Sequence, residues 1–417
     1  MNASLSHGVY DVVIVGGGIV GLAAGMELLE RFPHLSLLLL EKEPALGAHQ
    51  TSHNSGVIHS GIYYRPGSAK ARTCVTGAKL MVEFCRAHGI RHELCGKLVV
   101  ATEDSDVPAL QSLYERGVAN GVPGLSLVGP ERLRELEPHA RGVKALHVPG
   151  AGLVDYQVVA EKFAEIIAGR GGHIRTGARV VRFARREGFW HVETTIGEIR
   201  SRALITCGGL HADRLAVMAG GPADVRIVPF RGEYYGVIPS RRFLVRSMIY
   251  PVPNPQLPFL GVHFTRSITG MVHAGPNAVL ALRREGYRKT DVSLSEILSL
   301  MGFAGFWRMA TKFWLTGLSE FYRSFSKTAF VQALQQLVPE IQSRDLAPAP
   351  SGVRAQAVDL RGWLLDDFDI IAINHALLIR NVPSPAATAS ISVGDVIAEM
   401  ASQTFGFQGR RTSNKSA

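Results

Sequence analysis

Three glycines near the start of the chain, Gly16, Gly18 and Gly21, follow the spacing G-x-G-x-x-G. The apolar run from Tyr10 to Val15 comes directly before them and is typical of a buried parallel strand. The first glycine of this motif allows a tight turn, the second lets the backbone approach a pyrophosphate, and the third lets the following helix pack on the strand. The amide groups that open that helix would face the phosphates. The motif therefore predicts a nucleotide-binding strand-turn-helix unit at the beginning of the fold.

The residues after the motif strengthen this prediction. A second apolar run at 35–40 ends at Glu41, where an acidic side chain would hold the ribose hydroxyls of a dinucleotide. A glycine-rich turn without a ligand would need neither the second strand nor the acid in register. The motif alone does not separate NAD from FAD, although many flavoenzymes carry their dinucleotide domain first.

The length of the chain bounds the number of domains, and its composition and charge bound the class of protein and its partners. A chain of 417 residues exceeds one ordinary core, which favours two domains or one domain with a large insertion. A hydrophobic fraction of 46% and a charged fraction of 19% are typical of a globular protein. The formal net charge of +10 favours an anionic partner such as nucleic acid, a lipid surface or an acidic substrate. Nucleic acid is the weakest of these, because no nucleic-acid motif is evident and the arginines are dispersed.

Other sequence signals bear on location and metal binding. The four cysteines are too few for a disulfide scaffold, and no Cys/His cluster has zinc spacing. Residues 1–9 lack the features of a signal peptide, and there is no run of about 18 apolar residues. We therefore expect reduced thiols, no metal site and a cytoplasmic location.

Hydrophobic periodicity predicts the remaining elements. Strands are expected as a pair at 171–175 and 178–183, as a hairpin at 190–194 and 198–200, at 203–207, in an antiparallel sheet within 228–281, and at 353–379. Helices are expected at 158–169, within 292–340 and at 391–400.

The segment from His49 to Tyr64, HQTSHNSGVIHSGIYY, resembles the hallmark of the L-2-hydroxyglutarate dehydrogenase/oxidase family. Its members are FAD enzymes of the D-amino-acid-oxidase-like superfamily. The resemblance continues at residues 66–72, 207–214, 230–235, 250–253, 258–266, 274–278, 351–356 and 383–389. The matches span residues 10–395, and most are not generic to Rossmann proteins.

This resemblance implies an α/β fold in which a discontinuous, Rossmann-like FAD-binding domain carries an inserted α+β substrate domain built on an antiparallel sheet. The FAD-binding domain is then expected at 8–90, 155–225 and 350–405. The substrate domain is expected at 91–154 and 226–349, with a flexible tail at 406–417. The implied reaction, with non-covalent FAD, is oxidation of L-2-hydroxyglutarate to 2-oxoglutarate. The hydride of C2 would pass to flavin N5, and the electrons then to a membrane quinone or to O2.

The resemblance also assigns residues to the cofactor. The expected FAD contacts are Gly16, Gly18, Gly21, Glu41, Thr51, Ser52, Asn54, Ser55, Gly56, Val180, Cys207, Gly208, Ser384, Pro385, Ala386, Ala387 and Thr388. The loop 384–388 is expected at the pyrimidine end of the flavin, where the following helix would direct its positive N-terminus. An ordinary capped helix is the alternative.

His59 is the first candidate for the catalytic base, because histidine is the commonest acid–base group near neutral pH. Its H-N-S-G-V-I-H setting is similar to that of a catalytic histidine in α-glycerophosphate oxidases, and the same comparison places Ser55 beside the flavin ring. The alternative is that His53 and His59 only orient the loop.

A dianionic substrate needs cationic clamps, and arginine binds carboxylates bidentately. Arg266 and Arg354 are the candidates, and His263 is a further catalytic candidate. His263 and Arg266 share one predicted strand at i, i+3, so their side chains should point to opposite faces unless a bulge intervenes. Three tyrosines, Tyr63, Tyr64 and Tyr235, would either donate hydrogen bonds to the substrate or only pack.

The stretch 295–328 is rich in aromatic residues interleaved with basic ones, and it includes Trp307 and Trp314. This pattern predicts an amphipathic anchor in a membrane interface. Together with the positive net charge, it would hold the protein peripherally on the cytoplasmic face of a membrane. A pair of core helices in the substrate domain is the alternative.

Three other functions stay open at this stage. A sibling flavoenzyme would oxidise glycerol 3-phosphate or an amino acid. A membrane-associated binding protein would hold FAD without turnover. An NAD-dependent dehydrogenase would have no need for the loop around His59 and would purify without colour.

Overall fold

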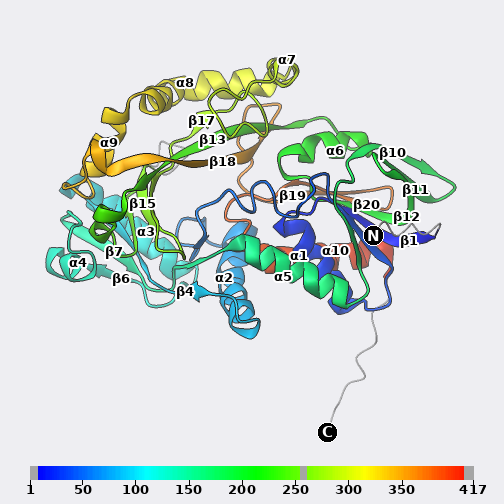
Figure 1. Cartoon of the computed structure of the whole chain (residues 1–417), viewed down its shortest axis with the longest axis horizontal. Coiled ribbons are helices and arrows are strands. Elements are labelled where there is room, and N and C mark those ends of the chain that lie inside the picture. Colours follow the sequence, from blue (N-terminus) through cyan, green and yellow to red (C-terminus); the bar gives the residue numbers. More distant parts are fainter. Residues whose placement is uncertain (1–7, 254–260, 408–417) are drawn as a thin grey trace, which may run out of the picture. The chain divides into compact units, whose positions relative to one another are not determined.

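The computed structural model describes residues 8–253 and 261–407. Residues 258–260 of the resemblance and 408–417 of the expected tail lie outside this range. The chain, shown in Figure 1, divides into two compact units. The first unit contains residues 1–51, 156–225 and 368–417, and the second contains 52–155 and 226–367. Residues 52–90 and 350–367, expected in the FAD-binding domain, thus cluster with the second unit.

The first unit is built on a parallel sheet core. Strand β1 (Val9–Val15) lies between β2 (Leu37–Leu40) and β12 (Gly197–Thr206) and runs parallel to both. Apolar side chains on both faces of β1 and β2 are buried, as is typical of parallel strands covered on both sides. Strand β9 (His173–Arg175) extends this sheet beyond β2.

The other edge of this sheet divides in two. The first half of β12 pairs with β11 (Phe189–Thr194), which continues to β10 (Val180–Arg186) in an antiparallel meander. The second half of β12 pairs with β20 (Ala376–Asn381), which is followed by β19 (Asp369–Ile373). The hairpin prediction is confirmed. The predicted pairing of 171–175 with 178–183 is wrong, because β9 follows a crossover helix and returns to the parallel edge beside β2.

Helices α1 (Ile19–Arg31), α5 (Tyr156–Gly169) and α10 (Ser390–Phe405) pack together in this unit, and α6 (Ala212–Met218) follows β12. Glycines allow these helices to pack closely against one another. A Cβ on Gly25 of α1 would lie 3.0 Å from Ile167 of α5, and a Cβ on Gly394 of α10 would lie 2.8 Å from the backbone of Ala23. The small residues therefore bring α10 onto α1, and α1 carries the glycine motif at its N-terminus.

The second unit is built on a larger sheet with the strand order β17-β13-β16-β15-β14-β5-β7-β6, and β18 pairs with β13. The strands are β5 (Lys97–Ala101), β6 (Ser126–Val128), β7 (Lys144–Val148), β13 (Val225–Val237), β14 (Met248–Pro251), β15 (His263–Arg266), β16 (Val272–Gly275), β17 (Val279–Leu280) and β18 (Leu346–Asp359). Antiparallel pairing dominates, as predicted, although β14 runs parallel to β5. A small antiparallel sheet joins β3 (Val57–Ile58), β8 (Gly152–Val154) and β4 (His92–Glu93).

The two faces of the larger sheet pack against different helices. Val99 and Tyr250 lie in one core cluster with side chains of α3 (Val107–Ala119). Leu98 and Phe264 lie in another cluster with side chains of α4 (Pro130–Leu136) and α9 (Lys327–Gln335). Helix α2 (Ala69–Ala87) follows the loop after β3. Side chains that alternate along one strand therefore belong to different cores.

The helical prediction for 292–340 is confirmed by α7 (Leu294–Met301), α8 (Ala304–Phe325) and α9. Helix α8 is kinked at Phe313, whose φ is −114°. None of the described helices has the length and hydropathy needed to cross a bilayer.

Candidate active site

The turn between β1 and α1 admits only glycine at two positions. Gly16 has a φ of +117°, and a Cβ there would lie 2.2 Å from the carbonyl oxygen of Cys207. A Cβ on Gly21 would lie 2.1 Å from the carbonyl oxygen of Gly16. Both contacts are far inside van der Waals distance, so the fold itself requires these two glycines.

Gly18 is different, because nothing in the described protein requires its glycine. Its φ is −77°, which any residue adopts, and the nearest atom to a Cβ would be Thr51 Oγ1 at 3.6 Å. The missing side chain leaves the backbone open to a group from outside the chain. A pyrophosphate at the N-terminus of α1 is such a group.

Two side chains accept hydrogen bonds from the same turn. Glu41 Oε2 accepts from Gly17 N at 2.7 Å, and Thr51 Oγ1 accepts from Ile19 N at 3.0 Å. Glu41 Oε1 also accepts from Glu43 N at 2.9 Å, so its carboxylate is fixed at the end of β2. Each carboxylate oxygen has a second lone pair that a ribose hydroxyl could use.

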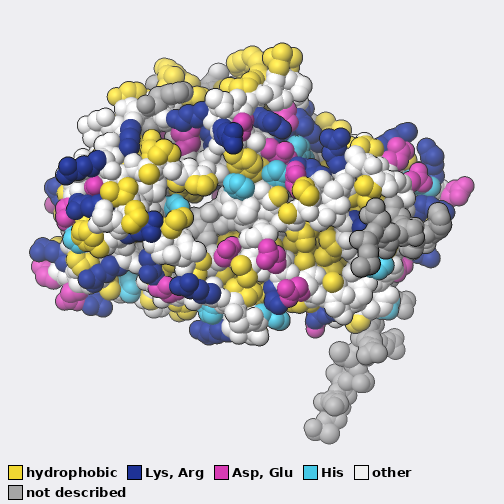
Figure 2. Space-filling view, in the orientation of Figure 1, with side chains coloured by type: hydrophobic (Ala, Val, Ile, Leu, Met, Phe, Trp, Pro, Cys, Tyr) yellow, Lys and Arg dark blue, Asp and Glu magenta, His cyan; other side chains and the backbone are white. Residues whose placement is uncertain are grey.

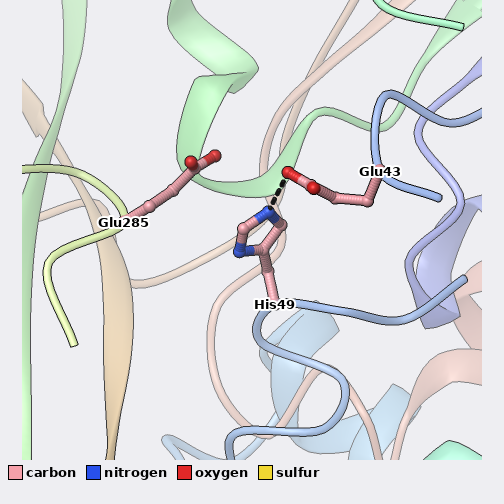
Figure 3. Close-up of side chains that lie close together, drawn as sticks. All are labelled: Glu43, His49 and Glu285. Carbon is pink, nitrogen blue, oxygen red and sulfur yellow. Dashed lines mark hydrogen bonds and ion pairs between the residues drawn. The ribbon is translucent and has the colours of Figure 1, made fainter. Parts of the chain in front are cut away.

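A cluster of ionisable side chains holds the segment after Glu41. His49 Nε2 lies 3.0 Å from Glu43 Oε1 (Figure 3). It also lies 2.9 Å from Lys42 Nζ. Lys42 also pairs with Glu43. The hydrogen bonds from Lys42 and His49 lower the pKa of Glu43, which favours its ionised form. The cluster connects the end of β2 to the loop that leads to Thr51.

Three more of the expected cofactor residues belong to this unit. Cys207 donates its backbone N–H to Val15 O at 2.7 Å, and burial raises the pKa of its thiol to about 12. A Cβ on Gly208 would lie 2.5 Å from Leu215, so this glycine also serves helix packing. Val180 begins β10 and packs, partly buried, against the core of the sheet.

The loop 384–388 leads into α10 in the same unit. The Thr388 hydroxyl is fully buried and lies 2.8 Å from the Tyr156 hydroxyl. Ala389 N donates to Pro385 O at 3.1 Å, and no side chain caps the N-terminus of α10. The first unit therefore contains the glycine motif, Glu41, Thr51 and this loop, as the nucleotide prediction requires.

The next four expected cofactor residues, Ser52, Asn54, Ser55 and Gly56, lie in the second unit. Gly56 has a φ of +67° and donates its N–H to Asn54 Oδ1 at 2.8 Å. Gly56 O accepts from Val154 N at 2.8 Å, which fixes this loop to β8. Ser52 and Asn54 are exposed, and Ser55 is half-buried.

His59 follows β3 and is half-buried. Its carbonyl oxygen accepts from the Cys74 thiol of α2 at 3.6 Å. His53 lies apart from this contact, since its ring packs against Tyr287 at a centroid distance of 4.3 Å. The two histidines of the loop therefore have different surroundings.

His263 is buried at the start of β15. Its ring stacks on Tyr250 with a centroid distance of 3.8 Å and an interplanar angle of 24°. Its Nδ1 lies 2.8 Å from Gly261 O, so Nδ1 carries the proton in the neutral ring. Thr265, two residues on, lies on the same face, with its hydroxyl 3.3 Å from that of Tyr250.

His59 and His263 act on each other electrostatically and share two further neighbours, Lys97 and Arg354. Burial, with these positive charges, lowers the pKa of His59 to about 3. Burial also lowers the pKa of His263 to about 4, and it outweighs the hydrogen bond to Gly261, which raises that pKa; Lys97 and Arg354 add to the lowering. Both rings are therefore neutral at neutral pH and are able to accept a proton.

Arg354 lies on β18; the residue is partly exposed, but burial lowers the pKa of its guanidinium, which acts on both histidines. Tyr64 and Tyr234 are also close enough to interact with it electrostatically. The loop that carries Tyr63 and Tyr64 is held by α3, because Asn120 Nδ2 donates to Tyr64 O at 2.9 Å. His59, His263, Arg354, Tyr63 and Tyr64 thus belong to one neighbourhood.

Arg266 and Tyr235 lie elsewhere in the same unit. Arg266 alternates with Thr265 along β15, pairs with Glu93 and lines a cavity of about 220 Å³. Tyr235 packs edge-on against Phe330 at 4.9 Å, in the core cluster that contains Phe264. The opposite orientation expected for His263 and Arg266 is present in β15.

Three side chains of the histidine neighbourhood were not foreseen from the sequence: Lys97, Tyr234 and Tyr250. Lys97 carried a usable signal, because it stands at the head of the apolar run KLVVA. A lysine in a buried strand needs a partner or a role. The tyrosines carried none, since Lys97 beside Tyr250 comes from β5 and Arg354 beside Tyr234 comes from β18, both far away in the sequence.

Comparison with known proteins identifies the family. Residues 11–400 match the family described as FAD dependent oxidoreductase. The chain belongs to this family. L-2-hydroxyglutarate dehydrogenase of Indibacter alkaliphilus is 48% identical over 397 residues, which cover 95% of this chain and all of the relative. The human mitochondrial L-2-hydroxyglutarate dehydrogenase is 45% identical, with 96% and 90% covered. The family resemblance found in the sequence is confirmed.

Solved structures confirm the fold of this FAD-dependent oxidoreductase. L-α-glycerophosphate oxidase from Mycoplasma pneumoniae, with FAD bound, superposes with a TM-score of 0.77 at 22% identity, covering 98% of this chain and 97% of that one. Glycine oxidase from Geobacillus kaustophilus gives a TM-score of 0.70 at 18% identity, with 95% of each chain covered. The predicted α/β flavoenzyme fold is confirmed.

The residues of the first unit fit the cofactor of this family. Gly18 offers open backbone at the N-terminus of α1, where the FAD pyrophosphate would bind. Glu41, fixed at the end of β2, would hold the ribose. The fit rests on a glycine that the protein fold does not itself need.

Proposed function

We propose that this FAD-dependent oxidoreductase oxidises L-2-hydroxyglutarate to 2-oxoglutarate. The observation that carries the proposal is the 48% identity to an L-2-hydroxyglutarate dehydrogenase along its entire length. Bound FAD supplies the acceptor for the two electrons of such an oxidation. The side chains around His59 supply the proton acceptor and the positive charge.

His59 is the proposed base for the C2 hydroxyl. Its low pKa leaves the imidazole neutral, so a lone pair is available before substrate binds. A bound dianion would raise the pKa of His59, because negative charge offsets the cations that lower it. Substrate binding would thus make His59 a stronger base at the moment when the proton must leave. His263, also neutral, is proposed to orient the hydroxyl through Nε2.

Arg354 is the proposed clamp for one carboxylate. Part of Arg354 is exposed while its guanidinium acts electrostatically on both histidines, and burial of that guanidinium lowers its pKa. Tyr63 and Tyr64 are proposed as the adjoining wall, since burial raises the pKa of both and keeps their hydroxyls protonated as donors. Arg266, paired with Glu93, is proposed to contribute only indirectly.

Steady-state turnover with an artificial dye acceptor tests this function. Turnover with L-2-hydroxyglutarate, and formation of one 2-oxoglutarate per two electrons, is the expected result. The D enantiomer, glycerol 3-phosphate and an L-amino acid are the controls. Turnover with glycerol 3-phosphate but not with the hydroxy acid would replace the proposed substrate with that of a sibling flavoenzyme.

We further propose that α7 and α8 touch an anionic membrane surface. Side chains exposed on these helices include Leu294, Leu298, Trp307, Trp314, Leu318 and Tyr322. Hydrophobic side chains gather at the upper edge in Figure 2, where Figure 1 labels α7 and α8. Phe303 and Met309 are buried against Val228 and Val358, so the helical segment has one packed and one exposed face.

The electrons would then leave to a quinone in that membrane, with O2 as the alternative acceptor. Co-sedimentation with vesicles that contain anionic lipid tests this surface. The double variant Trp314→Ser, Leu318→Ser should bind these vesicles less than the wild type does. Binding unchanged by the double variant would refute this surface. Comparison of quinone-analogue reduction with O2 consumption decides the acceptor.

A further inference from the structure

Lys97 is a buried lysine to which none of the described residues supplies a counter-charge. It begins β5 and is only 1% exposed, among the largest fully buried side chains of the described chain. Its Nζ lies 4.5 Å from the ring centroid of Tyr63 and 4.9 Å from that of Tyr250. Within residues 8–253 and 261–407, Nζ has no hydrogen-bond partner.

The groups that face Lys97 carry no negative charge at neutral pH. They are Cys74 from α2, Tyr63 from the loop after β3, and Tyr250 from β14. Burial raises the pKa of Cys74 to about 12 and raises those of both tyrosines. Two ring faces offset part of the cost of burying an ammonium. Unlike a buried ion pair, this arrangement leaves the positive charge uncompensated.

That charge acts on the proposed reaction centre. Lys97 is one of the cations that disfavour protonation of His59 and His263. Tyr250 contacts both Lys97 and His263, since its ring lies near Nζ and stacks on the imidazole. Little water screens the interaction, because Nζ and the His263 ring are both buried.

We propose that Lys97 is a positioning residue for an anionic substrate. Its ammonium supplies the unneutralised positive charge that a bound carboxylate offsets, and it keeps His59 and His263 neutral until the anion arrives. It acts through the tyrosine rings and the low local dielectric rather than by contact, because Nζ is not accessible to solvent. The identity of the anion rests on the proposed function, whereas the role of Lys97 rests on its own surroundings.

The test is the pH dependence of 2-oxoglutarate binding to the FAD-loaded protein, measured by titration calorimetry from pH 6 to 9. Burial lowers the pKa of Lys97 to about 7, so the wild-type affinity should fall as pH rises through about 7 and the ammonium is lost. In the protein without bound anion, the pKa values of His59 and His263 are about 3 and 4 and that of Cys74 is about 12, so none of these groups changes charge in this window before the anion binds. Tyr63 and Tyr250, with raised pKa values, stay neutral there, and the Arg354 guanidinium stays charged although burial lowers its pKa from 12.5.

Lys97→Met keeps most of the length of the side chain and removes the charge. Below pH 7 this variant should bind 2-oxoglutarate about tenfold more weakly or worse, which corresponds to roughly 1.4 kcal/mol, and its affinity should not fall between pH 6 and 9. Lys70→Met is the matched control. Lys70 also lies over a tyrosine ring, 4.7 Å from the centroid of Tyr64, but its charge is compensated by Asp366 at 2.6 Å.

Each result bears on the proposal. Unchanged affinity and pH dependence in Lys97→Met would overturn it, as would an equal loss in Lys70→Met. If Lys97→Met does not fold, a wild-type affinity that is flat through pH 7 would still overturn it. The wild type could instead bind glycerol 3-phosphate and not 2-oxoglutarate, with the same loss of affinity in Lys97→Met. That result would support the role of Lys97 and refute the proposed substrate. A wild type that binds neither anion would overturn the role of Lys97.

Discussion

Gly18 and Gly21 belong to one motif but have different roles: Gly18 leaves space for the cofactor, and Gly21 lets the backbone of the turn pack closely. A matched pair of alanine substitutions separates the two roles. In Gly18→Ala the new methyl group would lie no closer than 3.6 Å to any described protein atom. In Gly21→Ala it would lie 2.1 Å from the carbonyl oxygen of Gly16. The first change should therefore affect the cofactor, and the second should affect the fold.

The magnitudes follow from these distances. Gly18 is the N-cap of α1, where alanine replaces glycine at a cost of about 1 kcal/mol or less in the stability of the FAD-free protein. A methyl group pushed against a bound pyrophosphate should cost about 1–3 kcal/mol of binding, or roughly 10- to 100-fold in the Kd of FAD. Gly21→Ala forces backbone apart and should destabilise the FAD-free protein by about 3 kcal/mol, at the upper end of overpacking costs.

Urea unfolding of the deflavinated proteins gives the stability of each variant, and flavin fluorescence titration gives the Kd of FAD. The reasoning would be refuted if Gly18→Ala bound FAD as tightly as the wild type. It would also be refuted if Gly18→Ala lost as much FAD-free stability as Gly21→Ala, since the fold would then need both glycines.

Three further predictions concern the second unit. His59→Gln should keep FAD and lower kcat by roughly 10²- to 10⁴-fold, as expected for loss of a general base; stopped-flow reduction of the flavin checks this, and normal reduction would remove His59 as the base. Arg354→Lys keeps the charge but loses bidentate geometry, so KM for L-2-hydroxyglutarate should rise about tenfold with kcat less affected; an unchanged KM would place the clamp elsewhere. Burial holds the pKa values of His59 and His263 at about 3 and 4, below the ordinary value of 6.5, so the unfolded chain takes up protons that the folded chain does not as pH falls below 6.5. The free energy of unfolding should therefore be lost progressively from pH 6.5 towards 4, with a shallower loss in His263→Gln; equal pH slopes in urea unfolding would contradict this.

The sequence was most informative where a local pattern has one structural solution. The glycine motif, the apolar runs of β1 and β2, and Glu41 are all close together in the chain, and their arrangement follows from a single supersecondary unit. The hairpin of β11 and β12 was predictable for the same reason, because its strands are joined by a short turn. In β15 the two-residue period was enough to place His263 and Arg266 on opposite faces.

Long-range pairing was harder to predict. Strand β9 pairs with β2, from which it is separated by more than 130 residues, so proximity in sequence favoured the wrong neighbour, β10. The stack of His263 on Tyr250 and the position of Lys97 depend on the order β15-β14-β5, in which β5 comes from a distant part of the chain. Arg266 was predicted to bind a substrate carboxylate because it is an arginine. Its ion pair with Glu93 depends instead on the position of β4, which the sequence pattern does not give. Such contacts follow from sheet order, which no local pattern contains.

The central claim is that this chain takes electrons from L-2-hydroxyglutarate onto FAD. The most direct measurement is the visible spectrum of the purified, FAD-loaded protein under anaerobic conditions, recorded before and after L-2-hydroxyglutarate is added. We predict that the yellow absorption of the oxidised flavin is bleached by the L acid, and not by the D acid or glycerol 3-phosphate. A yellow protein that the L acid leaves unbleached, while one of the other two reduces it, would contradict the claim.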